Sequence, residues 1–172
     1  MKGCGHRQHH RSFHAARLGK LHRAFSVFLF DSAGRMLLQQ RAAGKYHFGG
    51  LWTNACCSHP RRGQTVIESA RARLRHELGI DAPLHELFSF VYRAEDPATG
   101  LTEHEFDHVL VGRFDGAPSP NGDEVSDWEW IEPGALLEDV RRRAARYTPW
   151  FKIVLERVIR QVAVDGGKGA GA

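Results

Sequence analysis

A single well-marked helix between runs of strand-forming residues constrains the fold more than any other feature of the sequence. The segment at residues 61–80 reads RRGQTVIESARARLRHELGI. Thr65 and Glu68 have the spacing of a capping box, and Gly79 stands where a helix C-cap is expected. Apolar residues recur at helical spacing, at Ile67, Ala70, Leu74 and Leu78. The segment therefore predicts a helix over residues 66–78.

Strand-forming residues flank this helix on both sides. Two runs, AFSVFLFD at 24–31 and MLLQQR at 36–41, are separated by a turn and predict two antiparallel strands. WTNACCSHP at 52–60 predicts a short strand that is stopped by Pro60. Further strands are expected at 84–95, 103–116 and 126–133, and a helical region at 134–162 with an interruption at Pro149. This order predicts an α/β (α+β) fold in which mixed strands are sandwiched between helices.

The 172 residues are expected to form one domain, over residues 14–163. A basic, histidine-rich segment at 1–13 precedes this domain, and a flexible, glycine-rich tail at 164–172 follows it. Three cysteines cannot all pair, and a disulfide between neighbouring cysteines is severely strained, which favours a reduced, cytoplasmic setting. No apolar stretch approaches the roughly 18 residues of a membrane helix, so no membrane partner is expected.

Positive charge is concentrated at the start of the chain. The net charge is +4, and the basic residues that precede the first acidic residue, Asp31, are Lys2, Arg7, Arg11, Arg17, Lys20 and Arg23. Such a segment suits an anionic partner, or is simply a solvated basic tail. Nucleic acid is one candidate, but no basic stretch is interleaved with stacking aromatics. A small phosphorylated ligand fits at least as well, and no nucleic-acid partner is expected.

The adjacent cysteines in WTNACCSHP are expected to have different surroundings. In a strand alternate side chains share a face, so Cys57 and His59 point one way while Cys56 and Ser58 point the other. A buried cysteine most often packs as a small hydrophobic residue, and we assign that part to Cys56. Cys57 is then the cysteine that is available for chemistry.

The same alternation predicts an inward face of carboxylates in LTEHEFDHVLV, residues 101–111. The residues of this face are Glu103, Glu105, Asp107, Val109 and Val111. Inward carboxylates raise one another's pKa unless a cation or an acid–base task keeps them there. A metal ion bound by two glutamates and by some of His14, His22 and His59 would remove the repulsion, and imidazole with carboxylate suits zinc, manganese or iron. The alternative is a polar strand end that water solvates.

Four residues could bind a phosphorylated ligand. Arg73 and Glu77 are four apart on the predicted helix, so they form either a surface ion pair or a guanidinium for phosphate beside a carboxylate for magnesium. Arg41 and Lys45, four apart around a turn, could complete a clamp for a diphosphate.

Residues 58–80 resemble a degraded Nudix box, in which Glu77, Gly79 and Ile80 match but most of the glutamates are replaced. The loss of those glutamates argues against hydrolysis.

The chain more closely resembles the type 1 isopentenyl diphosphate isomerase family, a branch of the Nudix fold. The motifs that carry this resemblance, between about His14 and Trp150, are LHRAFSVFLF, LLQQRAAGKY, LWTNACCSHP, RLRHELGI, YRAED, EHE and TPWF. The resemblance implies a Nudix-like fold and a 1,3-proton shift that interconverts isopentenyl and dimethylallyl diphosphate through a tertiary carbocation.

The resemblance also implies roles for single residues. Those in catalysis are Cys57, Glu105 and Tyr92. The ligands of a divalent metal (Mn²⁺, Zn²⁺ or Mg²⁺) are His14, His22, His59, Glu103 and Glu105. Glu77 and Cys57 are assigned to the site of a magnesium ion that arrives with the substrate. The substrate contacts are Arg41, Lys45 and Arg73 for the diphosphate, and Trp150 for the cation. A small-molecule diphosphate substrate, no organic cofactor, and a monomer or weak dimer are expected.

Two alternatives to the isomerase remain open at the level of sequence. One is a Nudix pyrophosphohydrolase of a nucleotide, favoured by Glu77 and the fold. The other is a diphosphate- or RNA-binding module that is weakened as a catalyst, suggested by the basic N-terminus and by the absence of the strand that usually precedes the first metal histidine. His9 or His10 could also take the place of His14 as a metal ligand.

Overall fold

The structure is a computed structural model and describes residues 19–168. Its elements are, in chain order, β1 (His22–Phe30), β2 (Met36–Arg41), β3 (Trp52–Asn54), β4 (Cys56–Ser58), α2 (Val66–Leu78), β5 (Leu84–Glu95), β6 (Thr102–Arg113), β7 (Val125–Ile131), α3 (Pro133–Arg142), the short 3₁₀ helix η1 (Ala144–Arg146) and α4 (Pro149–Lys168). None of the helices in this part of the chain is long and apolar enough to cross a membrane.

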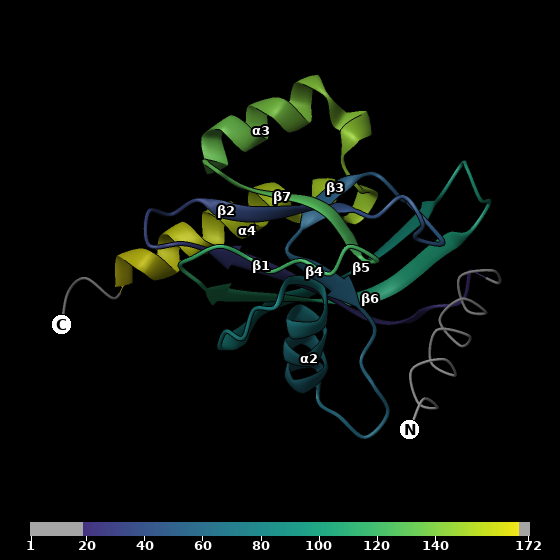
Figure 1. The fold of residues 1–172 in the computed structure, drawn as a ribbon, viewed down its shortest axis with the longest axis horizontal. Coiled ribbons are helices and arrows are strands. Elements are labelled where there is room, and N and C mark those ends of the chain that lie inside the picture. Colours follow the sequence, from purple (N-terminus) through teal and green to yellow (C-terminus); the bar gives the residue numbers. More distant parts are fainter. Residues whose placement is uncertain (1–18, 169–172) are drawn as a thin grey trace.

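The strands join in one seven-stranded mixed sheet. Its main path runs β3–β2–β1–β6–β5, while β4 pairs with β1 and β7 pairs with β2. The pairing of β1 with β6 is parallel, and the other pairings are antiparallel. Helix α2 covers one face of the sheet, and α3 and α4 lie on the other side (Figure 1). The expected α/β (α+β) sandwich of mixed strands and helices is confirmed.

The central strand β1 shows why the run AFSVFLF is apolar at nearly every position. Phe25, Val27 and Leu29 pack with α2, whereas Phe28 and Phe30 pack with α4. Because both faces of the strand are covered, both sets of alternating side chains are apolar. Burial of such side chains stabilises the fold by about 1.5–3 kcal/mol each.

Local helix signals in α2 are confirmed. Thr65 accepts a hydrogen bond from the Glu68 backbone, Glu68 bonds back to the Thr65 backbone, and Gly79 adopts the left-handed conformation at the C-terminus. Ile67 shares the helical spacing but is 37% exposed, so the apolar stripe that packs on the sheet is Ala70, Leu74 and Leu78. The helix is thereby fixed on the sheet with Glu77 also buried.

The segment predicted as one strand at 52–60 is two strands. β3 pairs with β2 and β4 pairs with β1, so the chain changes partner at Ala55. The Asn54 side chain donates to the carbonyls of Val27 and Cys56 at 3.0 and 2.9 Å, which satisfies backbone groups at the change. The strand ends at Ser58, before Pro60.

The C-terminal boundaries also differ from the prediction. Pro149 begins α4 instead of interrupting a helix, as suits a residue without a backbone N–H at the first turn. The break lies before it, at residues 143–148, where the backbone N–H of Thr148 donates to the carbonyl of Trp52. α4 continues to Lys168, beyond residue 162 where we expected the helical region to end, and the flexibility expected for residues 164–172 stays a prediction.

Candidate active site

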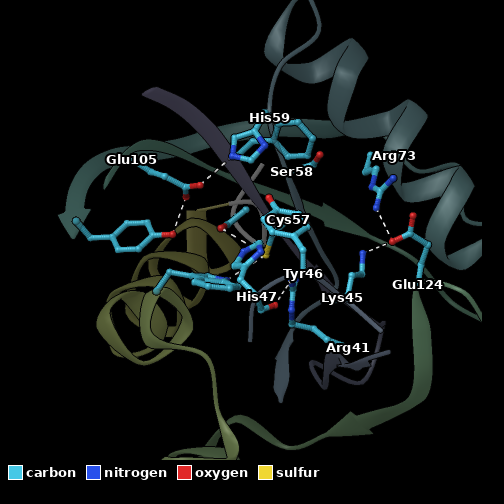
Figure 2. Close-up of a pocket in the computed structure, with 14 residues that line it drawn as sticks. Arg41, Lys45, Tyr46, His47, Cys57, Ser58, His59, Arg73, Glu105 and Glu124 are labelled. Atoms are coloured by element: carbon cyan, nitrogen blue, oxygen red, sulfur yellow. Dashed lines mark hydrogen bonds and ion pairs between the residues drawn. The ribbon is translucent and has the colours of Figure 1, made fainter. Parts of the chain in front are cut away.

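One pocket gathers side chains from β1, β2, β4, β5, β6, α2, α4 and the loops before β3, α2 and β7. Figure 2 shows Cys57 near its centre, Glu105 on one side, and Lys45, Arg73 and Glu124 on the other. The residues expected from sequence that line it are Arg41, Lys45, Cys57, His59, Arg73, Tyr92, Glu105 and Trp150. His22 contacts Glu105, and Glu77 contacts Arg73. Glu103 contacts His47, a further residue of the pocket lining. His14, like His9 and His10, lies outside the described residues.

The two cysteines have the different surroundings that strand alternation predicts. Cys56 is fully buried in the core between the sheet and α2, while Cys57 lines the pocket. The Cys57 thiol donates to Oδ1 of Asn54 at 3.1 Å and accepts from Nε1 of Trp150 at 3.1 Å. Burial, with the nearby Asp107 carboxylate, raises the pKa of Cys57 to about 12, so the sulfur carries a proton near neutral pH.

Glu105 lies on β6 and lines the same pocket as Cys57. Its Oε2 accepts a 2.6 Å hydrogen bond from the Tyr92 hydroxyl, and its Oε1 lies 3.0 Å from Nε2 of His59. Burial opposes ionisation, but the hydrogen bonds from His22, His59 and Tyr92 outweigh it and lower the pKa of Glu105. The carboxylate of Glu105 is therefore ionised and held in one orientation.

Four donors form a cluster that could hold a metal ion. Single atoms of His22, His59, Glu103 and Glu105 all lie within 4.8 Å of one another. The parallel register of β1 and β6 sets His22 beside Glu105, although 83 positions separate them in the chain (105 − 22). Nδ1 of His22 lies 2.8 Å from the carbonyl of Lys20, which leaves Nε2 to face the cluster.

The cluster fits a cation better than it fits a set of protein hydrogen bonds. Both carboxylate oxygens of Glu103 are buried, and neither has a hydrogen bond of good geometry within residues 19–168; their contacts there are with the imidazoles of His22 and His47. Burial, and then the charge of Glu105, raise the pKa of Glu103 to about 8. A divalent ion would relieve this repulsion, and two imidazoles with two carboxylates suit zinc or manganese. The inward face of carboxylates expected from sequence is confirmed, because Glu103, Glu105 and Asp107 are all buried.

His47 is a pocket residue that the sequence did not single out. Its Nε2 lies 3.1 Å from Oε1 of Glu103, whereas His22 faces the other carboxylate oxygen, Oε2. Burial, and then the charge of Arg41, lower the pKa of His47 to about 3, so the imidazole is neutral. A lone histidine in the loop KYHFGG has no spacing pattern, and only the fold of that loop brings it to Glu103.

Arg41 is expected to contact the diphosphate, and in the structure much of it is engaged by its own loop. Its Nε and Nη2 donate to the carbonyls of Phe48 and His47 at 3.2 and 3.0 Å. Its guanidinium carbon also lies 5.5 Å from the ring centre of Trp150. Arg41 thus shapes the loop and lies over the indole, and its contact with a diphosphate stays a prediction.

The ion pair of Arg73 and Glu77 is not on the surface. Nε of Arg73 lies 2.6 Å from Oε1 of Glu77, and the Glu77 side chain is 2% exposed. Glu124, which the sequence did not suggest as a site residue, contacts both Lys45 and Arg73. It comes from the turn NGDEV before β7, where acidic residues are ordinarily solvated. The interpretation of Arg73 and Glu77 as a surface ion pair is wrong, because this face of α2 borders the pocket.

Comparison with known proteins agrees with the fold. A family model described as NUDIX domain matches residues 20–151. Isopentenyl-diphosphate Delta-isomerase 2 of Aromatoleum aromaticum is 51% identical over 152 residues, which cover 88% of this chain and 80% of the relative. Isopentenyl-diphosphate Delta-isomerase of Nocardia farcinica is 53% identical over 138 residues, covering 80% of this chain and 79% of the relative.

Among solved structures, the MutT protein from Methanosarcina mazei is similar with a TM-score of 0.68. The match covers 82% of this chain and 94% of that chain at 13% identity, so it shows the fold alone. The family match, the relatives at about half identity and the shared fold lead to one conclusion. The chain belongs to the Nudix family, and within it to the isopentenyl-diphosphate Delta-isomerases.

Proposed function

We propose that this protein interconverts isopentenyl diphosphate and dimethylallyl diphosphate. The observation that supports it most directly is the placement of Cys57 and Glu105 on different strands around one pocket, with the indole of Trp150 beside the thiol. The relatives named isopentenyl-diphosphate Delta-isomerase support the same activity. Moving the double bond needs one proton added to the terminal carbon and one removed from C2, which two groups on separate walls can do.

Cys57 and Glu105 are the two groups that exchange protons with the substrate. Formation of a C–H bond at the terminal carbon produces a tertiary carbocation, and loss of the C2 proton regenerates the alkene, so electrons and protons balance. The thiol holds its proton near neutral pH, and the carboxylate is ionised, so one wall starts as a proton donor and the other as an acceptor. Tyr92 keeps Glu105 oriented through its 2.6 Å hydrogen bond.

The aromatic wall of the pocket suits a cation. The Trp150 indole packs edge-on against Phe48 and donates its N–H toward Cys57. A carbocation over an indole face gains about 2 kcal/mol or more when water is excluded. Trp150 is 3% exposed, which meets that condition.

The metal centre would be formed by His22, His59, Glu103 and Glu105, with manganese, zinc or magnesium as the ion. When bound, such an ion sets the charge and the protonation state of Glu105. His14 remains a predicted further ligand. Lys45 and Arg73 would bind the diphosphate. Glu77 and Cys57 would lie at the site of the magnesium ion that accompanies the diphosphate. The substrate is then a small diphosphate, and no organic cofactor takes part.

Product analysis in heavy water tests the proposal. Purified protein is incubated with isopentenyl diphosphate, magnesium and manganese, and the products are followed by proton NMR. We expect dimethylallyl diphosphate and deuterium at the exchanged carbons. An absence of both would refute the isomerase, and release of inorganic phosphate would favour the pyrophosphohydrolase instead.

A further inference from the structure

Glu124 lies at the end of the pocket away from Glu105, where the diphosphate is proposed to bind (Figure 2). Its Oε2 contacts Nζ of Lys45 and lies 2.7 Å from Nη2 of Arg73. The side chain is 15% exposed, so water screens these contacts only in part. The two cations proposed for the diphosphate are therefore already bound by a carboxylate of the protein.

The same two cations also contact Glu77. Nε of Arg73 lies 2.6 Å and Nζ of Lys45 lies 3.6 Å from Oε1 of Glu77. Each cation is shared between the two carboxylates, and the four charges sum to zero. Oε2 of Glu77 accepts a 2.8 Å hydrogen bond from Gln39, which fixes this carboxylate in the buried interior.

This arrangement discriminates between two forms of a diphosphate. A metal-free diphosphate that takes Lys45 and Arg73 leaves the carboxylates of Glu77 and Glu124 without cations and adds its own negative charge beside them. A diphosphate that carries a divalent cation supplies positive charge to replace what the carboxylates lose. The electrostatic cost falls on the metal-free form alone.

We propose that Glu124 makes the pocket selective for metal-bound diphosphate, by holding Lys45 and Arg73 until a diphosphate arrives together with its divalent cation. This inference rests on the proposed function, since that places the diphosphate at Lys45 and Arg73. Glu124, and not Glu77, is the carboxylate to test, because it lies on a turn and not in the buried helix. The backbone of Glu124 makes its own hydrogen bonds, with Ala42 and Asn121, and these do not depend on the side chain.

The experiment measures binding of inorganic pyrophosphate by isothermal titration calorimetry, once with EDTA and once with excess magnesium. The wild-type protein should bind pyrophosphate far more weakly with EDTA. In Glu124→Gln the Kd for pyrophosphate measured with EDTA should fall at least tenfold. The ratio of this Kd to the Kd measured with magnesium should also fall at least tenfold. Glu138→Gln is the matched control, since Glu138 is an exposed α3 residue paired with Arg142, and it should keep the wild-type ratio.

A second variant separates charge from structure. Glu124→Asp keeps the negative charge and should keep a ratio within threefold of the wild type, and thermal unfolding of each variant verifies the fold. The inference is overturned if Glu124→Gln leaves the ratio unchanged, if it weakens both forms equally, or if wild-type protein binds pyrophosphate in neither condition. Because these measurements need no turnover, a protein that fails as an isomerase but shows the shift in ratio refutes the proposed reaction alone.

Discussion

At the scale of single residues, position along a strand decides the surroundings of each cysteine. Cys56 and Cys57 are neighbours in sequence, yet one packs against α2 and the other faces Asn54 and Trp150. Their thiols also have different polar surroundings, because only Cys57 has a donor and an acceptor at 3.1 Å. Substitutions at the two positions should consequently have separate effects.

Replacing each cysteine with alanine tests this separation. Cys57→Ala should lower kcat by about 10²–10⁴-fold, the usual contribution of a proton-transferring group, with little change in stability. Cys56→Ala should leave kcat within about threefold but lower the free energy of unfolding by about 1–2 kcal/mol, because it opens a small cavity in the core. The measurements are steady-state kinetics and urea denaturation. Equal losses of activity in both variants would contradict the assignment of faces.

At the scale of elements, ion pairs connect the loop before β7 with the loop after β2 and with α2. Glu124 contacts Lys45 from one loop and Arg73 from the helix. Partial burial opposes ionisation, but the hydrogen bond from Lys45 and the charges of Lys45 and Arg73 lower the pKa of Glu124 from 4.5 to about 2. The ionised carboxylate is thus more stable in the folded protein than in the unfolded chain.

The sign of this shift predicts an acid-dependent stability. A carboxylate with a lowered pKa in the folded state stabilises it above about pH 4.5, and that contribution is lost as the pH falls toward 2. After allowance for solvent screening, Glu124→Gln should be less stable than wild type by about 1–2 kcal/mol at pH 7. The difference should shrink steadily between pH 4.5 and 2. Urea denaturation across this range measures it, and a difference that is constant with pH would be inconsistent with the ion pairs.

At the scale of the whole molecule, the candidate metal centre connects parts of the chain that are far apart in sequence. His22 begins β1, His59 follows β4, and Glu103 and Glu105 lie in β6. Without a cation, the two buried carboxylates repel each other and destabilise the folded state. An ion that binds only the folded protein would therefore stabilise the entire sheet.

Thermal unfolding with and without metal checks this coupling. At a free Mn²⁺ concentration of about 100 times Kd, linkage gives about 2.7 kcal/mol, which corresponds to a rise in Tm of about 5–10 °C for a chain of this size. Differential scanning calorimetry with EDTA and then with Mn²⁺ gives the shift. Glu103→Gln should lose most of the rise, and a full rise in that variant would rule out Glu103 as a ligand.

Local signals in the sequence were enough for the elements and for one face of the site. The capping box at Thr65, the C-cap at Gly79 and strand alternation act over a few residues, so they predicted α2, the burial of Glu105 and the separation of the cysteines. The boundaries at Ala55 and Pro149 were predicted wrongly, because they depend on which strand or carbonyl the chain meets there.

The sequence by itself determined the fold class, the family resemblance and the residue types of the site, since these reside in short patterns and in the order of motifs. Only the tertiary structure decided the partners. The contact of Lys45 with Glu124 spans 79 positions, and that of His47 with Glu103 spans 56 (103 − 47). Such contacts arise from loop conformation and sheet register. No local period encodes either of these, which is why His47 and Glu124 emerge as pocket residues only in the folded molecule.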